Sequence, residues 1–371
     1  MSSNIQNQNK KDHPQPHRVV VAMSGGVDSS VAVALLVEQG FEVIGMMLRL
    51  WSEPGTGQQN RCCTPDAMAQ AKQVAAHLKI PFYAIDAQEP FYNHVVKYFI
   101  EGYTRGVTPN PCLVCNRQIR WGFLLNHALA FEAQYMATGH YARIRENSGR
   151  IQLLRAVDRS KDQSYVLHVL NQEQLSRALF PIGEYTKSEV RQLAQQFNLP
   201  VADRPDSQDL CFLGEGDYRA FLNRNSSQDH NPGLIKNHQG EILGEHCGLA
   251  MYTIGQRRGL GLSSPDPLYV LKKDLERNEL VVGAKEESDQ YELSAEDVNW
   301  LSIEPPVEPI RAQVKIRYKS ADEWAEIKPE ENGYVEVIFD REITGITPGQ
   351  AAVFYDEDIC LGGGIIQTSE R

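Results

Sequence analysis

The sequence predicts an α/β protein with a parallel-sheet domain, a small and mostly β central domain, and a C-terminal antiparallel β-barrel. Over the first 140 residues, short apolar strands alternate with amphipathic helices. This alternation is typical of a mainly parallel sheet that helices cover on both faces. From about residue 230 onward, Gly and Pro become frequent and apolar residues recur at every second position. That pattern is typical of short antiparallel strands in a small barrel or sandwich.

The parallel sheet is expected to contain short apolar strands, each followed by a helical segment. The strands cover residues 19–22, 41–48, 82–85 and 135–138. The helices cover residues 28–39, a segment that begins at Thr64-Pro65, and residues 89–103 and 117–130. Ligands of such sheets bind where the strands end, so Ser24, Leu48 and Gly139 are expected at one site.

The remaining elements suggest a division of the chain. Thr186 and Glu189 form a capping box that opens a further helix. Apolar residues alternate with polar ones around Val314 and again around Val337, as in strands. We therefore expect a disordered tail, a parallel-sheet catalytic domain, a central domain and a barrel domain, over residues 1–16, 17–212, 213–290 and 291–371.

The composition of the 371 residues excludes some classes of protein. Lys and Arg number 37 against 48 Asp and Glu, a net charge of −11. This balance disfavours non-specific binding to nucleic acid but permits a local basic patch. No apolar run approaches the ~20 residues of a membrane-spanning helix. The first 16 residues are polar, unlike a signal peptide, so we expect a cytoplasmic protein.

The segment from Ser24 to Ser30 has the features of a phosphate-binding loop. Gly25 and Gly26 allow the backbone to turn tightly and to bring its N–H groups close to an anion. The N-terminus of the following helix favours negative charge, and Asp28 is expected to hold a magnesium ion that bridges phosphates. The Gly-Lys-Ser/Thr of the common γ-phosphate-cleaving loop is missing. A plain glycine-rich turn is the alternative interpretation.

Three of the seven cysteines stand in polar, turn-like segments and are candidates for thiol chemistry. Cys112 and Cys115 follow an Asn-Pro pair, and Cys211 follows an Asp-rich segment. Cys115 stands just before an expected helix. A helix N-terminus and basic neighbours, here Arg117 and Arg120, lower the pKa of a thiol and make it a nucleophile.

Structural or metal-binding cysteines are the alternative. Cys247 and Cys360 fit the role of small apolar core residues, a role that fits the Cys112/Cys115 pair less well. A zinc knuckle is disfavoured because one Cys-x-x-Cys pair supplies only two ligands, and the adjacent Cys62 and Cys63 are too close for an ordinary second pair.

The loop SGGVDSS resembles that of the pyrophosphatase-loop (PP-loop) ATP family, whose members cleave ATP to AMP and pyrophosphate to form an adenylate. Further motifs select one branch. From about residue 18 to its end, the chain resembles the tRNA-specific 2-thiouridylases, which implies an adenine-nucleotide alpha-hydrolase-like fold for the first domain. The other motifs are NPCLVCN at 110–116, ATGHY at 137–141, KDQSY at 161–165, the Cys211 segment, GQRRGLG at 255–261 and IRY at 316–318.

The resemblance implies a role for each matching position. It implies that ATP binds to Ala22, Met23, Ser24, Gly25, Gly26, Val27, Asp28, Ser29, Leu48 and Gly139. It implies that the target base meets Asn110, Pro111 and Cys112. It implies tRNA contacts for His140, Lys161, Asp162, Gln163, Arg317, Tyr318 and Gln350. Cys115 is expected to be the nucleophile and Cys211 the persulfide carrier, with Asp28 catalytic through its magnesium ion.

The expected reaction is the 2-thiolation of uridine at the wobble position of tRNA. Adenylation turns the 2-oxygen into a leaving group. Sulfur from a Cys211 persulfide then replaces this oxygen, and a transient Cys115–Cys211 disulfide forms. The resemblance implies the tRNAs for lysine, glutamate and glutamine as substrates, a cysteine desulfurase or a sulfur-relay protein as donor, and a monomeric enzyme.

Rival interpretations use the same residues differently. Cys112, Cys115 and Cys211 are candidates to hold a 4Fe–4S cluster whose open iron carries hydrosulfide. An adenylating enzyme for a small molecule leaves the cysteines and the β-rich tail unused. A non-catalytic tRNA-binding or sulfur-carrier protein has no use for a phosphate loop.

The contacts with RNA also have plainer alternatives. A lone His140 is more typical of a structural histidine, and Arg117 to Arg120 are equally consistent with a solvated helix face. Arg317 and Tyr318 point to opposite faces of a regular strand, so at most one of them faces RNA unless the strand ends there.

Overall fold

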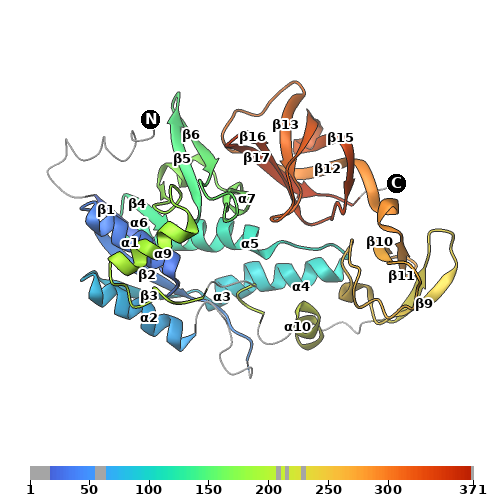
Figure 1. Cartoon of the computed structure of the whole chain (residues 1–371), viewed down its shortest axis with the longest axis horizontal. Helices are drawn as coiled ribbons and strands as arrows, with labels where there is room; N and C mark the ends of the chain where they lie inside the picture. The colour runs from blue at the N-terminus through green and yellow to red at the C-terminus, as the bar shows by residue number, and fades with distance from the viewer. Residues whose placement is uncertain (1–16, 55–63, 206–209, 214–216, 227–230, 369–371) are drawn as a thin grey trace.

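The computed structural model describes residues 17–54, 64–205, 210–213, 217–226 and 231–368. In Figure 1 the parallel sheet lies at one end of the molecule and the central domain at the other, with the barrel beside the helices that link them. The expected tail at 1–16 and the Cys62-Cys63 pair lie outside the described residues. The three-part architecture that the sequence predicts is confirmed.

The N-terminal sheet is parallel throughout, with the strand order β3-β2-β1-β4-β7. Its strands are β1 (Arg18–Ala22), β2 (Glu42–Arg49), β3 (Phe82–Asp86), β4 (Tyr135–Thr138) and β7 (Ala178–Leu179). The helices α1 (Val27–Glu38), α2 (Pro65–His77) and α9 (Lys187–Gln196) flank it. Thr64 caps α2, and Thr186 and Glu189 form the expected capping box of α9.

Two long helical segments contain wide π-helical turns. The first comprises α3 (Gln88–Phe91), η2 (Tyr92–Val96) and α4 (Lys97–Thr104); the second comprises α5 (Pro111–Val114), η3 (Cys115–Leu124) and α6 (Leu125–Ala130). The second begins six residues earlier than expected, because Asn110 caps it and accepts a hydrogen bond from the N–H of Cys112 at 3.2 Å. Cys112 and Cys115 therefore lie within its first turns and not in a loop before it. No described helix has the length and apolar character that crossing a membrane requires.

A hairpin that the sequence analysis missed links the sheet to the barrel. β5 (Ala142–Asn147) and β6 (Arg150–Arg155) pair with each other, and β6 also pairs with barrel strand β17. Ser148 and Gly149 form the turn with φ of 51° and 81°. A two-residue turn with both φ angles positive is typical of a tight hairpin, so the Asn-Ser-Gly sequence was the available signal.

The central domain is a small mixed sheet with the strand order β10-β11-β8-β9. Its strands are β8 (Gly233–Lys236), β9 (Ile242–His246), β10 (Tyr269–Asp274) and β11 (Glu279–Gly283). The helix α10 (Tyr218–Asn225) precedes the sheet, and the short helices η4 (Leu249–Met251) and η5 (Lys285–Ser288) complete the domain.

The C-terminal strands form a closed antiparallel barrel. They are β12 (Asp289–Trp300), β13 (Ile310–Lys315), β14 (Glu323–Pro329), β15 (Val335–Thr344), β16 (Ala351–Asp356) and β17 (Ile359–Ile366), with the short helix η6 (Glu331–Gly333) between β14 and β15. β12 pairs with both β15 and β17, which closes the ring. β13 ends at Lys315, so Arg317 and Tyr318 lie beyond the strand and escape the opposite-faces constraint.

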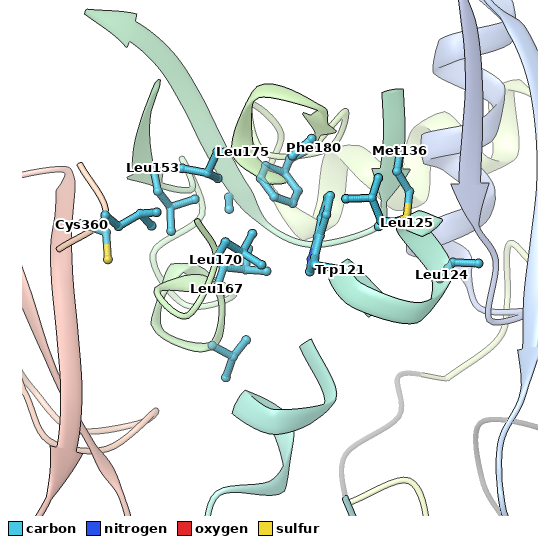
Figure 2. Packing of buried hydrophobic residues seen from close by; sticks show 14 of the residues in the cluster. Trp121, Leu124, Leu125, Met136, Leu153, Leu167, Leu170, Leu175, Phe180 and Cys360 are labelled. Carbon is cyan, nitrogen blue, oxygen red and sulfur yellow. The ribbon is translucent and has the colours of Figure 1, made fainter. Parts of the chain in front are cut away.

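One apolar core joins the catalytic domain to the barrel. In Figure 2, Trp121 and Leu125 from the second helical segment lie close to Phe180, with Leu153 of the hairpin and Cys360 of β17 farther along the same cluster. The short helices α7 (Ser164–Leu167) and α8 (Gln172–Ser176) also contribute to it. The helix that carries Cys115 is thus fixed against the barrel as well as the sheet.

Candidate active site

The loop between β1 and α1 has a shape that its own contacts fix. Gly25 has a φ of +71°, and a Cβ at this position would lie 2.3 Å from the carbonyl oxygen of Ala67 in α2. Glycine is therefore required here. The Oγ of Ser29 accepts a hydrogen bond from the N–H of Ser24 at 3.2 Å. This hydrogen bond holds the loop against the first turn of α1.

The end of β4 lies against the N-terminus of α1. A Cβ at Gly139 would lie 2.6 Å from the backbone nitrogen of Ser29. The N-cap residue of α1 is Gly26, which has no side chain to make a capping hydrogen bond. The first N–H groups of α1 and the helix dipole are thus suited to an anion.

A cavity of about 480 Å³ opens where β1, β2 and β4 end. This volume is in the range of small-molecule sites. Of the residues expected to bind ATP, the structure places all but Gly25 at its wall: Ala22, Met23, Ser24, Gly26, Val27, Asp28, Ser29, Leu48 and Gly139. From the set expected to contact tRNA, it places His140, Lys161, Gln163 and Tyr318 there.

Basic side chains surround this cavity. Those that line it are Arg120, Lys161, Lys187, Arg204 and Lys319. Among the described residues of the wall, Asp28 is the one acidic side chain. Since the whole protein has a net charge of −11, this local excess of positive charge favours a polyanionic ligand.

Asp28 is engaged with a lysine from another helix. Its Oδ1 accepts hydrogen bonds from Nζ of Lys187 at 2.7 Å and from the hydroxyl of Tyr141 at 2.9 Å. The Lys187 side chain is 13% exposed and that of Asp28 is 33% exposed. A metal ion that approaches this carboxylate must therefore compete with Lys187.

His140 is a buried neutral residue that holds Arg120. Its Nδ1 lies 2.8 Å from Oγ1 of Thr138, and its Nε2 lies 2.8 Å from Nη1 of Arg120. Burial, together with the positive charge of Arg120, keeps the pKa of His140 well below 6.5. Since arginine only donates, Nε2 is the acceptor and Nδ1 carries the proton. The ring thus fixes the guanidinium at the cavity wall.

The two thiols expected to carry the chemistry pack on one hydrophobic cluster. Cys115 and Cys211 are far apart in the sequence, and both are half-buried. Both contact the cluster that contains Phe212 and Leu50. Leu50 also lines the cavity. One apolar cluster thus contacts both cysteines and, through Leu50, reaches the cavity wall.

The described cysteines do not form a metal-binding group. Cys112 is exposed, in contrast to Cys115 and Cys211. Within the part of the chain that the structure describes, no three His, Cys, Asp or Glu side chains are arranged to hold a metal ion. The arrangement therefore does not fit the ligand set of the iron–sulfur alternative.

Tyr318 lies at the cavity wall and interacts electrostatically with Cys112. Its ring lies 6.2 Å from that of Tyr165, measured between centroids. Burial, and then the nearby Asp162 and Cys112, raise the pKa of Tyr318 to about 12. The hydroxyl therefore keeps its proton at neutral pH and remains a hydrogen-bond donor at the cavity wall.

Two other residues expected to contact tRNA make hydrogen bonds within the protein. Nε2 of Gln350 donates to the carbonyl oxygen of Thr108 at 2.8 Å, across the boundary between barrel and catalytic domain. Arg317 donates to the carbonyl oxygen of Gly345 within the barrel. Gln350 thus joins the barrel to the residues just before the second helical segment, whereas Arg317 is held within the barrel.

The segment 158–163 is shaped by its own polar groups. Asp162 is buried, and its carboxylate accepts hydrogen bonds from the N–H of Ala156 at 2.9 Å and the hydroxyl of Ser164 at 2.7 Å. Oε1 of Gln163 accepts from the N–H of Tyr141 at 3.0 Å. Asp162 therefore holds the segment, while Lys161 beside it lines the cavity.

The structure adds residues to the site that sequence reasoning did not assign. Lys187 is the first residue of α9, and a lysine in a first helical turn, where negative charge is favoured, was the available signal. Arg204 donates to the carbonyl oxygen of Gly25 at 2.8 Å, and no sequence pattern indicated it. Arg120 is not a solvated residue, because it binds His140.

The expectation for one structural cysteine is wrong. Cys360 is fully buried in β17, as expected, and burial raises the pKa of its thiol. Cys247 is exposed, because it follows the edge strand β9 and not a core strand.

Three family models match successive parts of the chain. The model described as tRNA methyl transferase HUP domain matches residues 17–215. The tRNA methyl transferase PRC-barrel domain matches residues 219–284, and the Aminomethyltransferase beta-barrel domain matches residues 290–366.

Curated relatives match nearly the whole chain. The tRNA-specific 2-thiouridylase MnmA 1 of Caldanaerobacter subterraneus subsp. tengcongensis is 49% identical, over 96% of this chain and 99% of its own. The tRNA-specific 2-thiouridylase MnmA of Symbiobacterium thermophilum is 48% identical, over 95% of this chain and 93% of its own. That of Natranaerobius thermophilus is 47% identical, over 94% and 97%.

Proposed function

Because the chain belongs to the tRNA-specific 2-thiouridylase family, we propose that it replaces the 2-carbonyl oxygen of a tRNA uridine with sulfur in an ATP-dependent reaction. The target is the uridine at the wobble position. The reaction has two parts, an adenylation that activates the oxygen and a sulfur transfer that displaces it. Different groups of residues serve the two parts.

The cavity serves the adenylation. The phosphates of ATP occupy the loop from Ser24 to Ser29, where the N-terminus of α1 and the surrounding cations offset their charge. The 2-oxygen of uridine attacks the α-phosphorus, pyrophosphate leaves, and the oxygen becomes part of an adenylate. When bound at Asp28, magnesium supplies further neutralisation of the departing pyrophosphate. AMP is then the leaving group in place of oxide.

The target base must leave its stack to reach this cavity, as bases generally do for chemistry on the ring. Asn110, Pro111 and Cys112 form one side of its path, and Tyr318 forms the other. The position of Tyr318 at the cavity wall and its electrostatic interaction with Cys112 support this path.

Cys211 and Cys115 serve the sulfur transfer. The outer sulfur of a Cys211 persulfide attacks C2 of the adenylated uridine, and AMP leaves. The thiolate of Cys115 then attacks the Cys211 sulfur, which releases thiocarbonyl sulfur on the base and leaves a Cys115–Cys211 disulfide. An external dithiol reduces this disulfide before the next turnover. The sulfur comes from a cysteine desulfurase, directly or through a relay protein.

The single observation that carries the proposal is the shared position of Leu50. This residue belongs both to the cavity wall and to the cluster against which Cys115 and Cys211 pack. A nucleotide site and two thiols that are linked by one apolar cluster support an adenylation followed by sulfur transfer. The small-molecule and carrier alternatives each leave one of these features without a use.

The test incubates the protein with tRNA, ATP, magnesium and a persulfide donor. Mass spectrometry of the digested nucleosides is expected to show 2-thiouridine, together with one AMP and one pyrophosphate per product. Cys115→Ser and Cys211→Ser should abolish 2-thiouridine while tRNA binding is retained. Cys247→Ser, which alters an exposed cysteine, is the matched control and should remain active. Normal 2-thiouridine formation by either of the first two variants would contradict the proposal.

We also propose the finer points that the family resemblance implies. The substrates are the tRNAs for lysine, glutamate and glutamine, and the enzyme acts as a monomer in the cytoplasm. The division at 17–212, 213–290 and 291–371 separates catalytic, central and barrel domains. Comparing bulk tRNA before and after the reaction, by mapping the thiolated species, tests the choice of substrate.

A further inference from the structure

Lys187 and Asp28 form an ion pair at the wall of the cavity, between two helices that pack against each other. Lys187 opens α9, whereas Asp28 lies in the first turn of α1. Nζ of Lys187 lies 2.7 Å from Oδ1 of Asp28, and both side chains line the cavity. The pair therefore lies beside the loop that holds the phosphates in the proposed function.

The position of Lys187 is unfavourable for helix stability alone. A positive charge at a helix N-terminus opposes the helix dipole, and carboxylates are the residues normally favoured there. α9 already has a complete capping box from Thr186 and Glu189, so its start does not need the lysine. A residue that breaks a local rule in an otherwise well-formed element is expected at a functional site.

The backbone holds Lys187 at the cavity. Its N–H donates to Oδ2 of Asp158 at 2.9 Å. The carbonyl oxygen of Asp158 in turn accepts from the N–H of Lys161, a second cation of the cavity wall. One residue thus fixes the backbones of two of the lysines that face the proposed phosphate site.

Asp28 keeps a hydrogen-bond partner if Lys187 leaves it. Oδ1 of Asp28 also accepts the hydroxyl proton of Tyr141 at 2.9 Å. If the ammonium group moves toward a phosphate, the carboxylate keeps this hydrogen bond and gains a place for a divalent cation. The exchange replaces one ion pair with two, and no charge in the cavity becomes isolated.

On these grounds, and resting on the proposed function, we propose that Lys187 binds the pyrophosphate portion of ATP and occupies the Asp28 carboxylate only while the cavity is empty. Entry of magnesium–nucleotide transfers the lysine from Asp28 to the β- and γ-phosphates and frees Asp28 for the metal ion. Lys187 therefore acts as a phosphate-binding residue and also prevents Asp28 from holding a cation before the nucleotide arrives.

The test measures binding of pyrophosphate, ATP and AMP by isothermal titration calorimetry without tRNA. Lys187→Met should weaken binding of ATP and pyrophosphate by about 10- to 100-fold, since a charge-assisted hydrogen bond is lost. AMP binding should stay close to that of the parent protein, because AMP lacks these phosphates. Lys187→Arg should retain most of the affinity. Lys72→Met, which removes an exposed lysine of α2, is the matched control and should bind all three ligands normally.

A second variant keeps the proposal testable if Lys187→Met does not fold. Asp28→Asn releases the lysine from its ion pair, so metal-free pyrophosphate should bind more tightly than to the parent protein. In the same variant, magnesium should no longer strengthen the binding of ATP.

The outcomes separate this proposal from the one that it rests on. Parent-like binding of pyrophosphate by a folded Lys187→Met protein overturns the role of Lys187, as does unchanged or weaker binding of metal-free pyrophosphate by Asp28→Asn. Failure of the parent protein itself to bind ATP or pyrophosphate overturns the proposed function instead.

Discussion

The proposed nucleotide end of the site is formed mainly by the catalytic domain, whereas its proposed tRNA end is assembled from two domains. At the nucleotide end, Gly25 packs against the backbone of α2 and Gly139 packs against the backbone of α1. At the tRNA end, Tyr318 and Gln350 come from the barrel and reach segments of the catalytic domain. The first part depends on local backbone geometry, and the second depends on how the barrel is attached.

We expect this difference to separate the binding of ATP from the binding of tRNA. Changes to the loop around α1 should weaken ATP binding whether or not tRNA is present. Changes at the junction between barrel and catalytic domain should weaken tRNA binding and leave ATP binding intact. The variants below test this separation, from the largest expected effect to the smallest.

The largest effect is expected for Gly25→Ala. The added Cβ would meet the carbonyl oxygen of Ala67 at 2.3 Å, so the loop must move away from α2. A displacement of this size should weaken ATP binding by about 100-fold or more, as measured by equilibrium titration. Gly40→Ala is the control, because Gly40 also has a positive φ, +83°, but faces open space. If Gly25→Ala binds ATP as well as Gly40→Ala does, the nucleotide end does not depend on this backbone fit.

The next effect is expected at the buried ion pair that anchors the segment carrying Tyr318. Nη2 of Arg155 lies 2.6 Å from Oδ2 of Asp322, and their side chains are 6% and 21% exposed. Arg155→Met leaves the carboxylate unpaired, which should cost about 3 kcal/mol of unfolding free energy. Binding of tRNA in a filter assay should weaken by about tenfold, since the segment loses its anchor.

ATP binding distinguishes this effect from general damage. It should change little in Arg155→Met, and an equal loss of ATP and tRNA affinity would contradict the separation of the two ends. Arg311→Met removes an exposed pair with Asp340 on the barrel surface and should change the unfolding free energy far less than Arg155→Met does.

The free energy of unfolding should fall in acid because of His168, which lies at the junction between the barrel and the catalytic domain. Burial lowers the pKa of this residue from 6.5 to about 4. The unfolded chain therefore binds the proton more readily, so the contribution is complete above about pH 6.5 and is lost as the pH falls toward 4. The loss amounts to about 3 kcal/mol when complete.

Urea unfolding at several pH values checks this prediction. The carbonyl oxygen of His168 accepts from Nδ2 of Asn299 in β12, which places it at the junction. His168→Gln should flatten the dependence of unfolding free energy on pH between 6.5 and 4. An unchanged slope in that variant would show that other groups cause the acid sensitivity.

The smallest effect is expected for Gln350→Ala. It removes the hydrogen bond to the carbonyl oxygen of Thr108, which corresponds to about 1 kcal/mol or about fivefold in tRNA affinity. Gln367→Ala is the control, because its side chain bonds to the carbonyl oxygen of Ile365 within the same strand region. Equal tRNA affinity of the two variants would show that the hydrogen bond of Gln350 does not contribute to tRNA binding.

The sequence predicts the nucleotide end better than the tRNA end, for a physical reason. Thr64 and Thr186 cap their helices as expected, and the strands that end at Ala22 and Thr138 converge as a parallel sheet requires. These features depend on the local preferences of residues for caps and strands, and on the regular spacing of apolar residues. The hairpin at 142–155 joins a strand from the other end of the chain, and no local pattern specifies that partner.

Side-chain partners that are far apart in the sequence could not be predicted, for the same reason. Nothing near Lys187 indicates that it meets Asp28, and nothing near Arg155 indicates Asp322. Asn110-Pro111 is a good helix start, but the cysteine pattern favours a loop there, so the predicted start of the second helical segment is six residues late. Sequence reasoning thus found the individual residues of Cys112 and Cys115 but not their helical setting.

The measurement that tests the account most directly counts disulfides in a single turnover. The parent protein, loaded with one persulfide at Cys211, is mixed with excess tRNA, ATP and magnesium without reductant, and its peptides are analysed by mass spectrometry. The account predicts one bond between Cys115 and Cys211 for each 2-thiouridine formed, appearing only when ATP is present. Formation of 2-thiouridine while both thiols remain reduced would contradict it.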